Sequence, residues 1–333
     1  MKKEDSWILW YENISIADVS RVGGKNAAIG EMYSSLSPLG IKIPNGFAVS
    51  ASGYHHFLEK ADLKEKIKNI LSDLDTKSIR NLQERGKKVR ELILRADLPH
   101  DLAEEIAKAY QQLCGKYQDR NLDVAIRSSA TAEDLPGASF AGQQESYLNI
   151  RGPRAVLSAT KKCMASLFTD RAISYRVDKG FSHFDVGLSV GIQRMIRSDL
   201  AASGVIFTLD TETGFDRVII INGIYGLGEL IVQGKVKPEE YLVFKPSLKE
   251  GHRAIIERSL GLKDKKLVYS LFGTRIKSVS PEDQKKYSLT DDEVLTLAQW
   301  SLSIEEHFSQ KHNRYQPMDI EWAKDGKSHE LFI

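Results

Sequence analysis

One stretch of the sequence limits the possible fold and ligands of this chain more than any other. It covers residues 124–146 and reads VAIRSSATAEDLPGASFAGQQES, an apolar strand that leads to an arginine, then hydroxyls, then a loop of small residues. The guanidinium of Arg127 offers a planar fork of donors that suits phosphate oxygens. The hydroxyls of Ser128, Ser129 and Thr131, with the backbone N–H groups of the loop, add further donors. The pattern suits a polyphosphate, although an ordinary strand and surface loop is the commoner structure behind such a string.

Composition narrows the class of protein. The 333 residues carry 47 basic and 45 acidic side chains, so no charge excess favours nucleic acid or an anionic membrane surface. The cysteines, Cys114 and Cys163, have neither metal-ligand spacing nor the pattern of a disulfide framework, which fits a reducing compartment. The N-terminus lacks the apolar core of a signal peptide, and no apolar run is long enough to span a bilayer. We therefore expect a cytoplasmic protein with no nucleic-acid or membrane partner.

A second candidate phosphate contact follows a pair of glycines. Gly23 and Gly24 predict a tight turn, and the apolar spacing after them predicts a helix that starts at Lys25. A lysine at a helix N-terminus would add its charge to the anion preference of that end. The spacing of a Walker A motif is absent, and a solvated surface lysine is the usual alternative.

A third candidate lies near the end of the chain. The string PMDIEWA alternates acidic and apolar residues, which predicts a half-buried strand with Asp319 and Glu321 on one face. Two carboxylates on a strand suit Mg²⁺ when phosphate oxygens and water supply its other ligands. An exposed edge that carries two acids is the alternative for an arbitrary D-x-E.

These three strings occur together in a known family. IRSSATAEDLPxASFAGQQE, VGGKNA and DIEW resemble the nucleotide-binding domain of phosphoenolpyruvate synthase, which is also found in pyruvate phosphate dikinase and rifampicin phosphotransferase. The resemblance covers nearly the whole chain and is weaker in the helical region and around residues 250–286. It implies an α/β (α+β) fold of the ATP-grasp type, in which two lobes clamp ATP with Mg²⁺.

The resemblance also implies roles for single residues. Arg127 and Lys25 become the catalytic pair, because they meet the charge on the transferred phosphoryl group. Glu321 becomes the metal ligand, with Asp319 as an occasional second ligand. The residues implied to contact the nucleotide are Lys25, Arg127, Gly142, Ser146, Gln193, Met195 and Glu229.

Several of these roles compete with a purely structural one. Gln193 and Met195 fall where the family has a strand edge whose backbone meets adenine, but a core methionine is equally common. Glu229, in the string GLGE, corresponds to a contact with the ribose hydroxyls. Arg171 and Arg176, in DRAISYR, are expected to form structural ion pairs, and Arg171 is a weaker candidate for supporting the site.

The domain organisation follows from the same reading. We expect a first lobe over residues 1–198, with a helical section over about residues 55–118, and a second lobe over residues 199–333. Residues 136–144 would form a lid over the phosphates. In the family, a strand like the last one continues into a glutamine that helps to hold metal and an arginine that contacts phosphate. We therefore expect the second lobe to be truncated at its end.

The implied reaction needs more than this chain. In the family, ATP phosphorylates a histidine on a swivelling domain, AMP and phosphate leave, and the phosphohistidine passes its group to pyruvate in a barrel domain. The eight histidines here are scattered, so we expect only the ATP-binding, phosphoryl-donor part. An antibiotic phosphotransferase of the rifampicin type and a non-catalytic nucleotide-binding module are the alternatives. The strings WYxxI, DRAISYR and SDLAASG favour the synthase.

Overall fold

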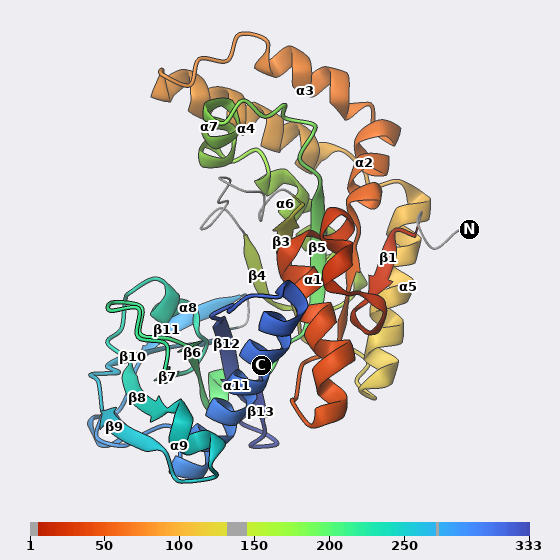
Figure 1. Ribbon diagram of the computed structural model, residues 1–333. Coiled ribbons are helices and arrows are strands. Elements are labelled where there is room, and N and C mark those ends of the chain that lie inside the picture. The colour runs from red at the N-terminus through yellow and green to blue at the C-terminus, as the bar shows by residue number, and fades with distance from the viewer. Residues whose placement is uncertain (1–5, 132–144, 271–272) are drawn as a thin grey trace. The chain divides into compact units, whose positions relative to one another are not determined.

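The chain divides into two compact units in the computed structural model (Figure 1). The structure describes residues 6–131, 145–270 and 273–333. Unit 1 comprises the described residues of Met1–Ser35 and Asn45–Met195, and unit 2 comprises those of Leu36–Pro44 and Ile196–Ile333. The short segment Leu36–Pro44, which the sequence placed in the first lobe, therefore packs with the C-terminal half of the chain.

Unit 1 is built on a five-stranded antiparallel sheet with the order β1-β2-β5-β3-β4. Its strands are β1 (Ile8–Trp10), β2 (Gly46–Val49), β3 (Val124–Ala130), β4 (Ser146–Ile150) and β5 (Leu188–Arg194). Its helices are α1 (Val19–Leu36), α2 (Ala51–Lys60), α3 (Leu63–Leu71), α4 (Ile79–Arg95), α5 (His100–Lys116), α6 (Pro153–Ser166) and α7 (Asp170–Asp178). Short 3₁₀ turns at Tyr11–Asn13 and Ile16–Asp18 connect β1 to α1.

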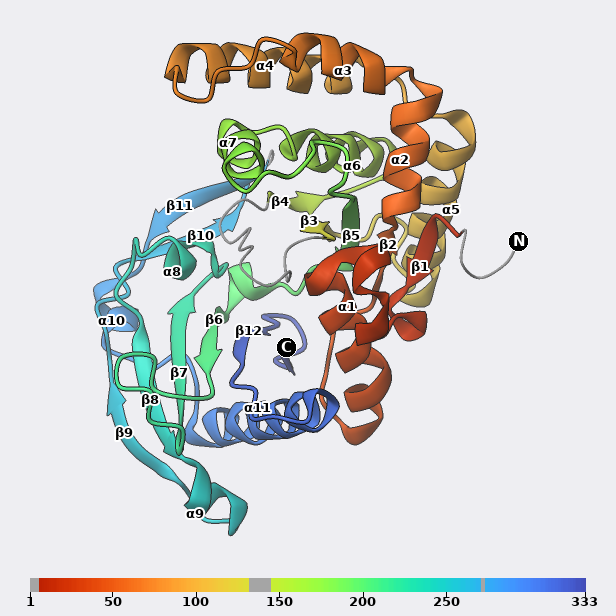
Figure 2. The ribbon, with the colours of Figure 1, turned by 45° about the horizontal axis from the view of Figure 1, so that its top comes forward.

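The two faces of this sheet differ in polarity. Val124, Ile126 and Ala130 of β3 alternate toward the main core, which they share with α2 to α6. The other face carries Ala125, Arg127 and Ser129, and α1 lies against it. Figure 2 shows α6 and α1 on opposite sides of the strands. A polar strip therefore exists inside unit 1, on the face that α1 covers.

The helices α3 to α5 follow the amphipathic pattern that the sequence predicts. Ile67, Val89, Ile93 and Ile106 are fully buried in the main core. On the outer surface charged residues pair along the helices, as Lys88 does with Glu84. These helices therefore form the helical section of unit 1, and the lysines and glutamates between the apolar positions are its solvated faces.

Unit 2 contains a six-stranded antiparallel sheet with the order β13-β12-β6-β7-β8-β9 and a separate pair, β10-β11. Its strands are β6 (Ala202–Phe207), β7 (Val218–Tyr225), β8 (Glu239–Phe244), β9 (Ile255–Ser259), β10 (Lys265–Tyr269), β11 (Thr274–Ser278), β12 (Asp319–Lys324) and β13 (Leu331–Phe332). Its helices are α8 (Glu229–Val232), α9 (Lys245–Lys249), α10 (Pro281–Gln284) and α11 (Asp291–His312), with 3₁₀ turns at Ser37–Leu39 and Ser198–Leu200.

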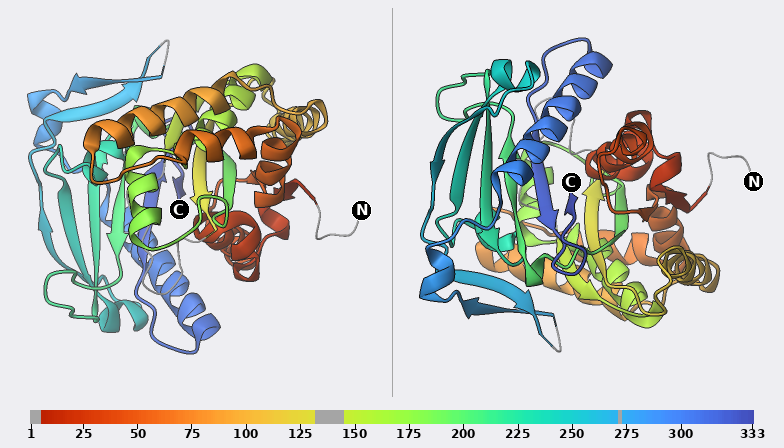
Figure 3. Two further views of the ribbon diagram at one scale, coloured as in Figure 1. Left: turned by 90° about the horizontal axis from the view of Figure 1, so that it is seen from above. Right: turned by 90° about the horizontal axis from the view of Figure 1, so that it is seen from below.

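The long helix α11 covers part of this sheet and packs against β7 and β8 (Figure 3). It begins with a capping box, in which the Thr290 hydroxyl accepts from the backbone of Glu293 and the Glu293 carboxylate accepts from the backbone of Thr290. This is the helix start that the threonine and the acids of the first turn predict. No helix in the described ranges has both the length and the apolar character needed to cross a membrane.

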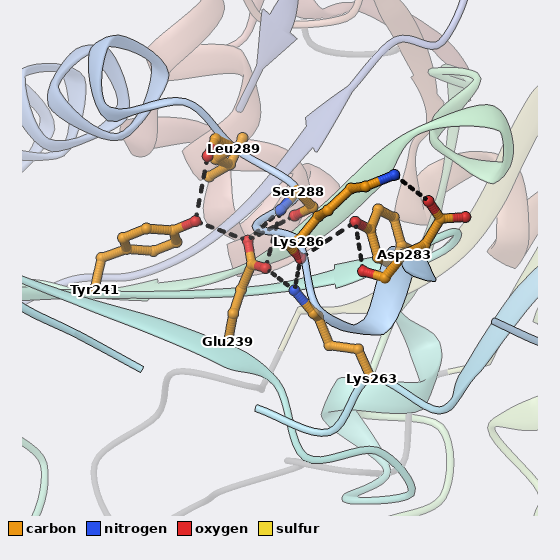
Figure 4. Close-up of polar contacts among 8 residues, drawn as sticks. Glu239, Tyr241, Lys263, Asp283, Lys286, Ser288 and Leu289 are labelled. Atoms are coloured by element: carbon orange, nitrogen blue, oxygen red, sulfur yellow. Dashed lines mark hydrogen bonds and ion pairs between the residues drawn. The ribbon is translucent and has the colours of Figure 1, made fainter. Parts of the chain in front are cut away.

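A buried ion pair lies beside β8 (Figure 4). Lys263 and Glu239 are both fully buried, and the ammonium of Lys263 contacts the carboxylate of Glu239. That ammonium also donates to the carbonyl of Lys286 at 2.6 Å. The carboxylate accepts from the hydroxyl of Tyr241 at 3.0 Å and from the hydroxyl of Ser288 at 2.7 Å. The network fixes the connection between β9 and β10, and the segment before α11, to β8.

Candidate functional site

Arg127 lies near the middle of β3 and is half-buried. In the strand register it is opposite Ser146 of β4 on one side and Gly191 of β5 on the other. Residues that are opposite in an antiparallel pair share a face, so Arg127 and Ser146 lie on one face of the sheet. Gly191 has no side chain, and the side chains of Asn26 and Tyr11 occupy the space over it, next to Arg127.

The helix that carries Lys25 meets the same face. The helical backbone of α1 is interrupted at Gly23, which has φ +74°, and a Cβ there would lie 2.2 Å from the hydroxyl oxygen of Ser129. The backbone N–H of Asn26 donates to that hydroxyl at 3.5 Å. The half-buried Lys25 therefore lies beside Ser129, which is two residues from Arg127 on the same face of β3. The predicted turn is present at Gly23, and the helical run that carries Lys25 begins after it as the sequence predicts, while a short helical stretch from Val19 precedes the turn.

Tyr11 lies among the polar residues where α1 meets β3, and the sequence analysis did not predict its role there. It is buried, and its hydroxyl donates to the side-chain oxygen of Asn26 at 3.3 Å. Burial raises the pKa of Tyr11 above its ordinary value, while the nearby charge of Arg127 opposes the rise. In the sequence Tyr11 stands just after the first strand and inside the string WYxxI, and neither feature indicates a hydrogen bond to the residues around Lys25.

The placement of Gln193 and Met195 corrects one expectation. Both were expected at a strand edge, but β5 lies between β2 and β3 in the interior of the sheet. Gln193 is buried and shares the face of Arg127, since it is opposite Ala125 as Arg127 is opposite Gly191. The backbone N–H of Met195 donates to the carbonyl of Asp123 at 2.9 Å. Any contact of these residues with adenine would therefore not use an open strand edge.

The carboxylate pair belongs to unit 2 and has the predicted arrangement. Asp319 and Glu321 of β12 are exposed, while Ile320 and Trp322 between and after them are buried. The two carboxylates therefore share one face of the strand, which fits a cation that takes its other ligands from phosphate and water. In the part of the chain that the structure describes, no group of three or more histidine, cysteine or acidic side chains could hold a metal by itself.

Glu229 is the first residue of α8, after a turn whose glycine, Gly226, has φ +85°. The hydroxyl of Ser203 donates to the carbonyl of Gly226 at 2.6 Å, which holds the turn against β6. Ser203 and Val205 are two residues apart in β6 and therefore lie on the same face of the sheet, and Val205 is opposite Glu321. The turn that leads to Glu229 therefore lies on the sheet face that carries Glu321.

Arg176 differs from its expected role. It is fully buried on α7, stacks on the ring of Phe168 and donates from Nε to Nδ1 of His183 at 3.1 Å. No carboxylate pairs with it within residues 6–131, 145–270 and 273–333, so the expected ion pair is wrong. Burial, and then the charge of Arg176, lower the pKa of His183 to about 4. Arg171 is exposed on the same helix.

Other expectations stay predictions. Gly142 and the proposed lid lie outside the described residues. Lys25 and Arg127 belong to unit 1 and Glu321 belongs to unit 2, so their convergence on one triphosphate stays a prediction.

Comparison with known proteins gives the family. Residues 19–333 match the family described as pyruvate phosphate dikinase, AMP/ATP-binding domain. The chain is 56% identical to the phosphoenolpyruvate synthase of Aquifex aeolicus over 333 residues, which is 99% of this chain and 39% of that protein. The synthases of Synechocystis sp. and Escherichia coli are 51% and 46% identical over 99% and 98% of this chain, and each match covers 41% of the relative. The chain spans about two fifths of the length of these curated relatives. It belongs to the pyruvate phosphate dikinase AMP/ATP-binding domain family.

Proposed function

We propose that this chain binds ATP with Mg²⁺ and is the phosphoryl-donor part of a phosphoenolpyruvate synthase. The observation that carries the proposal is the polar sheet face in unit 1, where Arg127 and Ser146 are opposite each other and the helix turn of Lys25 packs beside them. The family supports the nucleotide, and the names of the relatives support the synthase.

The candidate residues of unit 1 and those of unit 2 would hold different parts of the nucleotide. Arg127 and Lys25 would contact the phosphates and offset the negative charge that spreads over the transferring group. Ser146 and Gln193 lie on the same face and would bind beside them. Met195, which follows β5, would help to form the adenine pocket.

The candidate residues of unit 2 would hold the metal ion and the ribose. Asp319 and Glu321 would bind Mg²⁺, which when present neutralises phosphate charge, and Glu229 would accept from the ribose hydroxyls. We assign units 1 and 2 to the two lobes of an ATP-grasp fold, with residues 136–144 as the lid.

The complete reaction would require further domains. In the proposed scheme ATP phosphorylates a histidine on a swivelling domain, and AMP and phosphate are released. The phosphohistidine then passes its phosphoryl group to pyruvate on a barrel domain, which gives phosphoenolpyruvate. The relatives are more than twice as long as this chain, which leaves ample length for such domains.

Calorimetric titration with MgATP tests the binding proposal. We expect Arg127→Ala to weaken binding, because it removes charge-assisted donors to phosphate, and Arg80→Ala, at an exposed position on α4, to leave it unchanged. We expect Glu321→Gln to weaken binding of the Mg²⁺ complex. Glu257→Gln, at an exposed position on β9, is its matched control. Equal affinity in Arg127→Ala and the unaltered chain would remove Arg127 from the site.

The catalytic proposal needs the full-length protein. We expect Arg127→Ala to reduce ATP-dependent histidine phosphorylation by about 100-fold or more, the usual cost of losing a preorganised donor to the reacting group. Release of AMP supports the dikinase reaction, whereas release of ADP or absence of a phosphohistidine contradicts it. Circular dichroism of the variant shows whether the fold is retained.

A further inference from the structure

Asn26 is a buried polar side chain at the point where α1 meets the sheet of unit 1. It is 2% exposed, and its side-chain nitrogen donates to the carbonyl of Val22 and to the hydroxyl of Ser189, both at 3.1 Å. Its side-chain oxygen accepts from the hydroxyl of Tyr11 at 3.3 Å, and its backbone N–H donates to the hydroxyl of Ser129 at 3.5 Å. One residue therefore connects α1 to β3, to β5 and to the 3₁₀ turn that follows β1.

The partners of Asn26 are themselves held in place. The Ser189 hydroxyl donates to the carbonyl of Val49 in β2 at 2.8 Å, and Ser189 is opposite Ser129 in the strand register. Each of these hydrogen bonds joins buried groups, so the loss of one leaves a polar atom without a partner away from water. The cluster is therefore expected to be rigid.

Two glycines provide the space for this arrangement. A Cβ at Gly191 would lie 2.3 Å from the side-chain oxygen of Asn26 and 2.9 Å from the hydroxyl of Tyr11. Gly191 is also the residue directly opposite Arg127. A Cβ at Gly23 would lie 2.2 Å from the hydroxyl oxygen of Ser129. Any side chain at either position would push Asn26 or its helix away from the face that carries Arg127.

We propose that Asn26 is a positioning residue, which fixes the place of Lys25 relative to Arg127. Lys25 is its immediate neighbour, and Gly23 interrupts the helix just before them, so the preceding turn of α1 does not define where Lys25 lies. The side-chain bonds of Asn26 to Ser189 of β5 and to Tyr11, together with its backbone bond to Ser129 of β3, define the place of Lys25. The inference rests on the proposed function, since its consequence is the correct spacing of two phosphate contacts.

The first test compares nucleotide affinity with stability. Asn26→Leu keeps the approximate side-chain volume and removes the side-chain hydrogen bonds to Val22, Ser189 and Tyr11, while the backbone bond to Ser129 can remain. We expect it to raise the Kd for MgATP about tenfold at a temperature where the variant is fully folded, as when one charge-assisted contact to phosphate is lost. Val89→Ala, in the core of α4, destabilises the same unit and should leave the Kd unchanged. A residue with a merely structural role would lower the thermal midpoint without moving the Kd.

The second test asks whether Asn26 acts through Lys25. In a Lys25→Ala background, which has already lost the lysine contact, Asn26→Leu should change the Kd less than about twofold. Gly191→Ala should raise the Kd as Asn26→Leu does, because its methyl group would displace the Asn26 side chain.

The outcomes separate this inference from the proposed function. Unchanged affinity in Asn26→Leu, or an equal loss in the presence and absence of Lys25, overturns the positioning role and leaves the nucleotide site standing. Failure of the unaltered chain to bind MgATP, or full affinity in both Lys25→Ala and Arg127→Ala, overturns the proposed function and the positioning role together.

Discussion

Replacement of Lys263 by methionine should destabilise unit 2 strongly, because it leaves the carboxylate of Glu239 buried without its counter-charge. Both side chains are fully buried, and their contact is reinforced by the bond from the Lys263 ammonium to the Lys286 carbonyl. Loss of one partner from a buried pair typically costs about 3–5 kcal/mol. We expect a value near the lower limit, since Glu239 keeps its hydrogen bonds from Tyr241 and Ser288.

A destabilisation of about 3 kcal/mol corresponds to a fall of about 6–12 °C in the melting temperature of a unit of this size. The assay is thermal unfolding followed by circular dichroism, with urea unfolding to obtain the free energy of unfolding. Lys265→Met is the matched control, because Lys265 is an exposed lysine that pairs loosely with Asp264 at 3.6 Å. It should change the free energy of unfolding by less than about 0.5 kcal/mol.

The double variant Lys263→Met, Glu239→Gln decides the cause. It removes both charges, so much of the stability lost in the single variant should return. A single variant within about 1 kcal/mol of the unaltered chain would show that the buried pair contributes little. A double variant no more stable than the single one would show that packing of the lysine stem, and not the uncompensated charge, accounts for the loss.

Three further predictions concern stability. The pKa of His183 is lowered to about 4, from an ordinary value of 6.5, by burial and by the charge of Arg176, so the folded state favours the neutral ring. Stability should therefore fall as the pH drops from about 6.5 toward 4, and urea unfolding of His183→Gln should show a flatter pH profile over that window. Gly204→Ala should lower the melting temperature sharply, because its methyl carbon would lie 1.8 Å from the carbonyl oxygen of Asn222. Gly115→Ala, at an exposed position in α5 with nothing within 4 Å of the added methyl group, should instead raise the free energy of unfolding by about 0.5–1 kcal/mol, as urea unfolding would show.

The parts of the fold that local pattern determines could be predicted. The alternation of Asp319 and Glu321 with buried apolar residues appears in β12 as expected, because side chains in a strand point to opposite faces in turn. The helix start at Thr290 could be predicted because its capping residues are adjacent in sequence. Strand order is different, since it depends on which distant strands pair. No local signal distinguished the interior position of β5 from an edge, or joined Leu36–Pro44 to unit 2.

The candidate site likewise contains residues that the sequence could predict and residues that it could not. Arg127 and Lys25 were predicted as phosphate contacts because their charge suits phosphate and the strings around them resemble the family, whereas Tyr11 and Asn26 were not singled out, because their importance comes from what they touch. One signal was nevertheless present in the sequence. Asn26 occupies a position four residues after Val22, on the side of α1 that faces the sheet, where the helix would otherwise bury apolar residues. A buried amide at such a position requires partners of its own, and the hydroxyls of Ser189 in β5 and of Tyr11, with the carbonyl of Val22, provide them. A polar residue on the apolar side of a predicted helix therefore indicates a specific polar junction with the sheet, which composition and charge alone do not reveal.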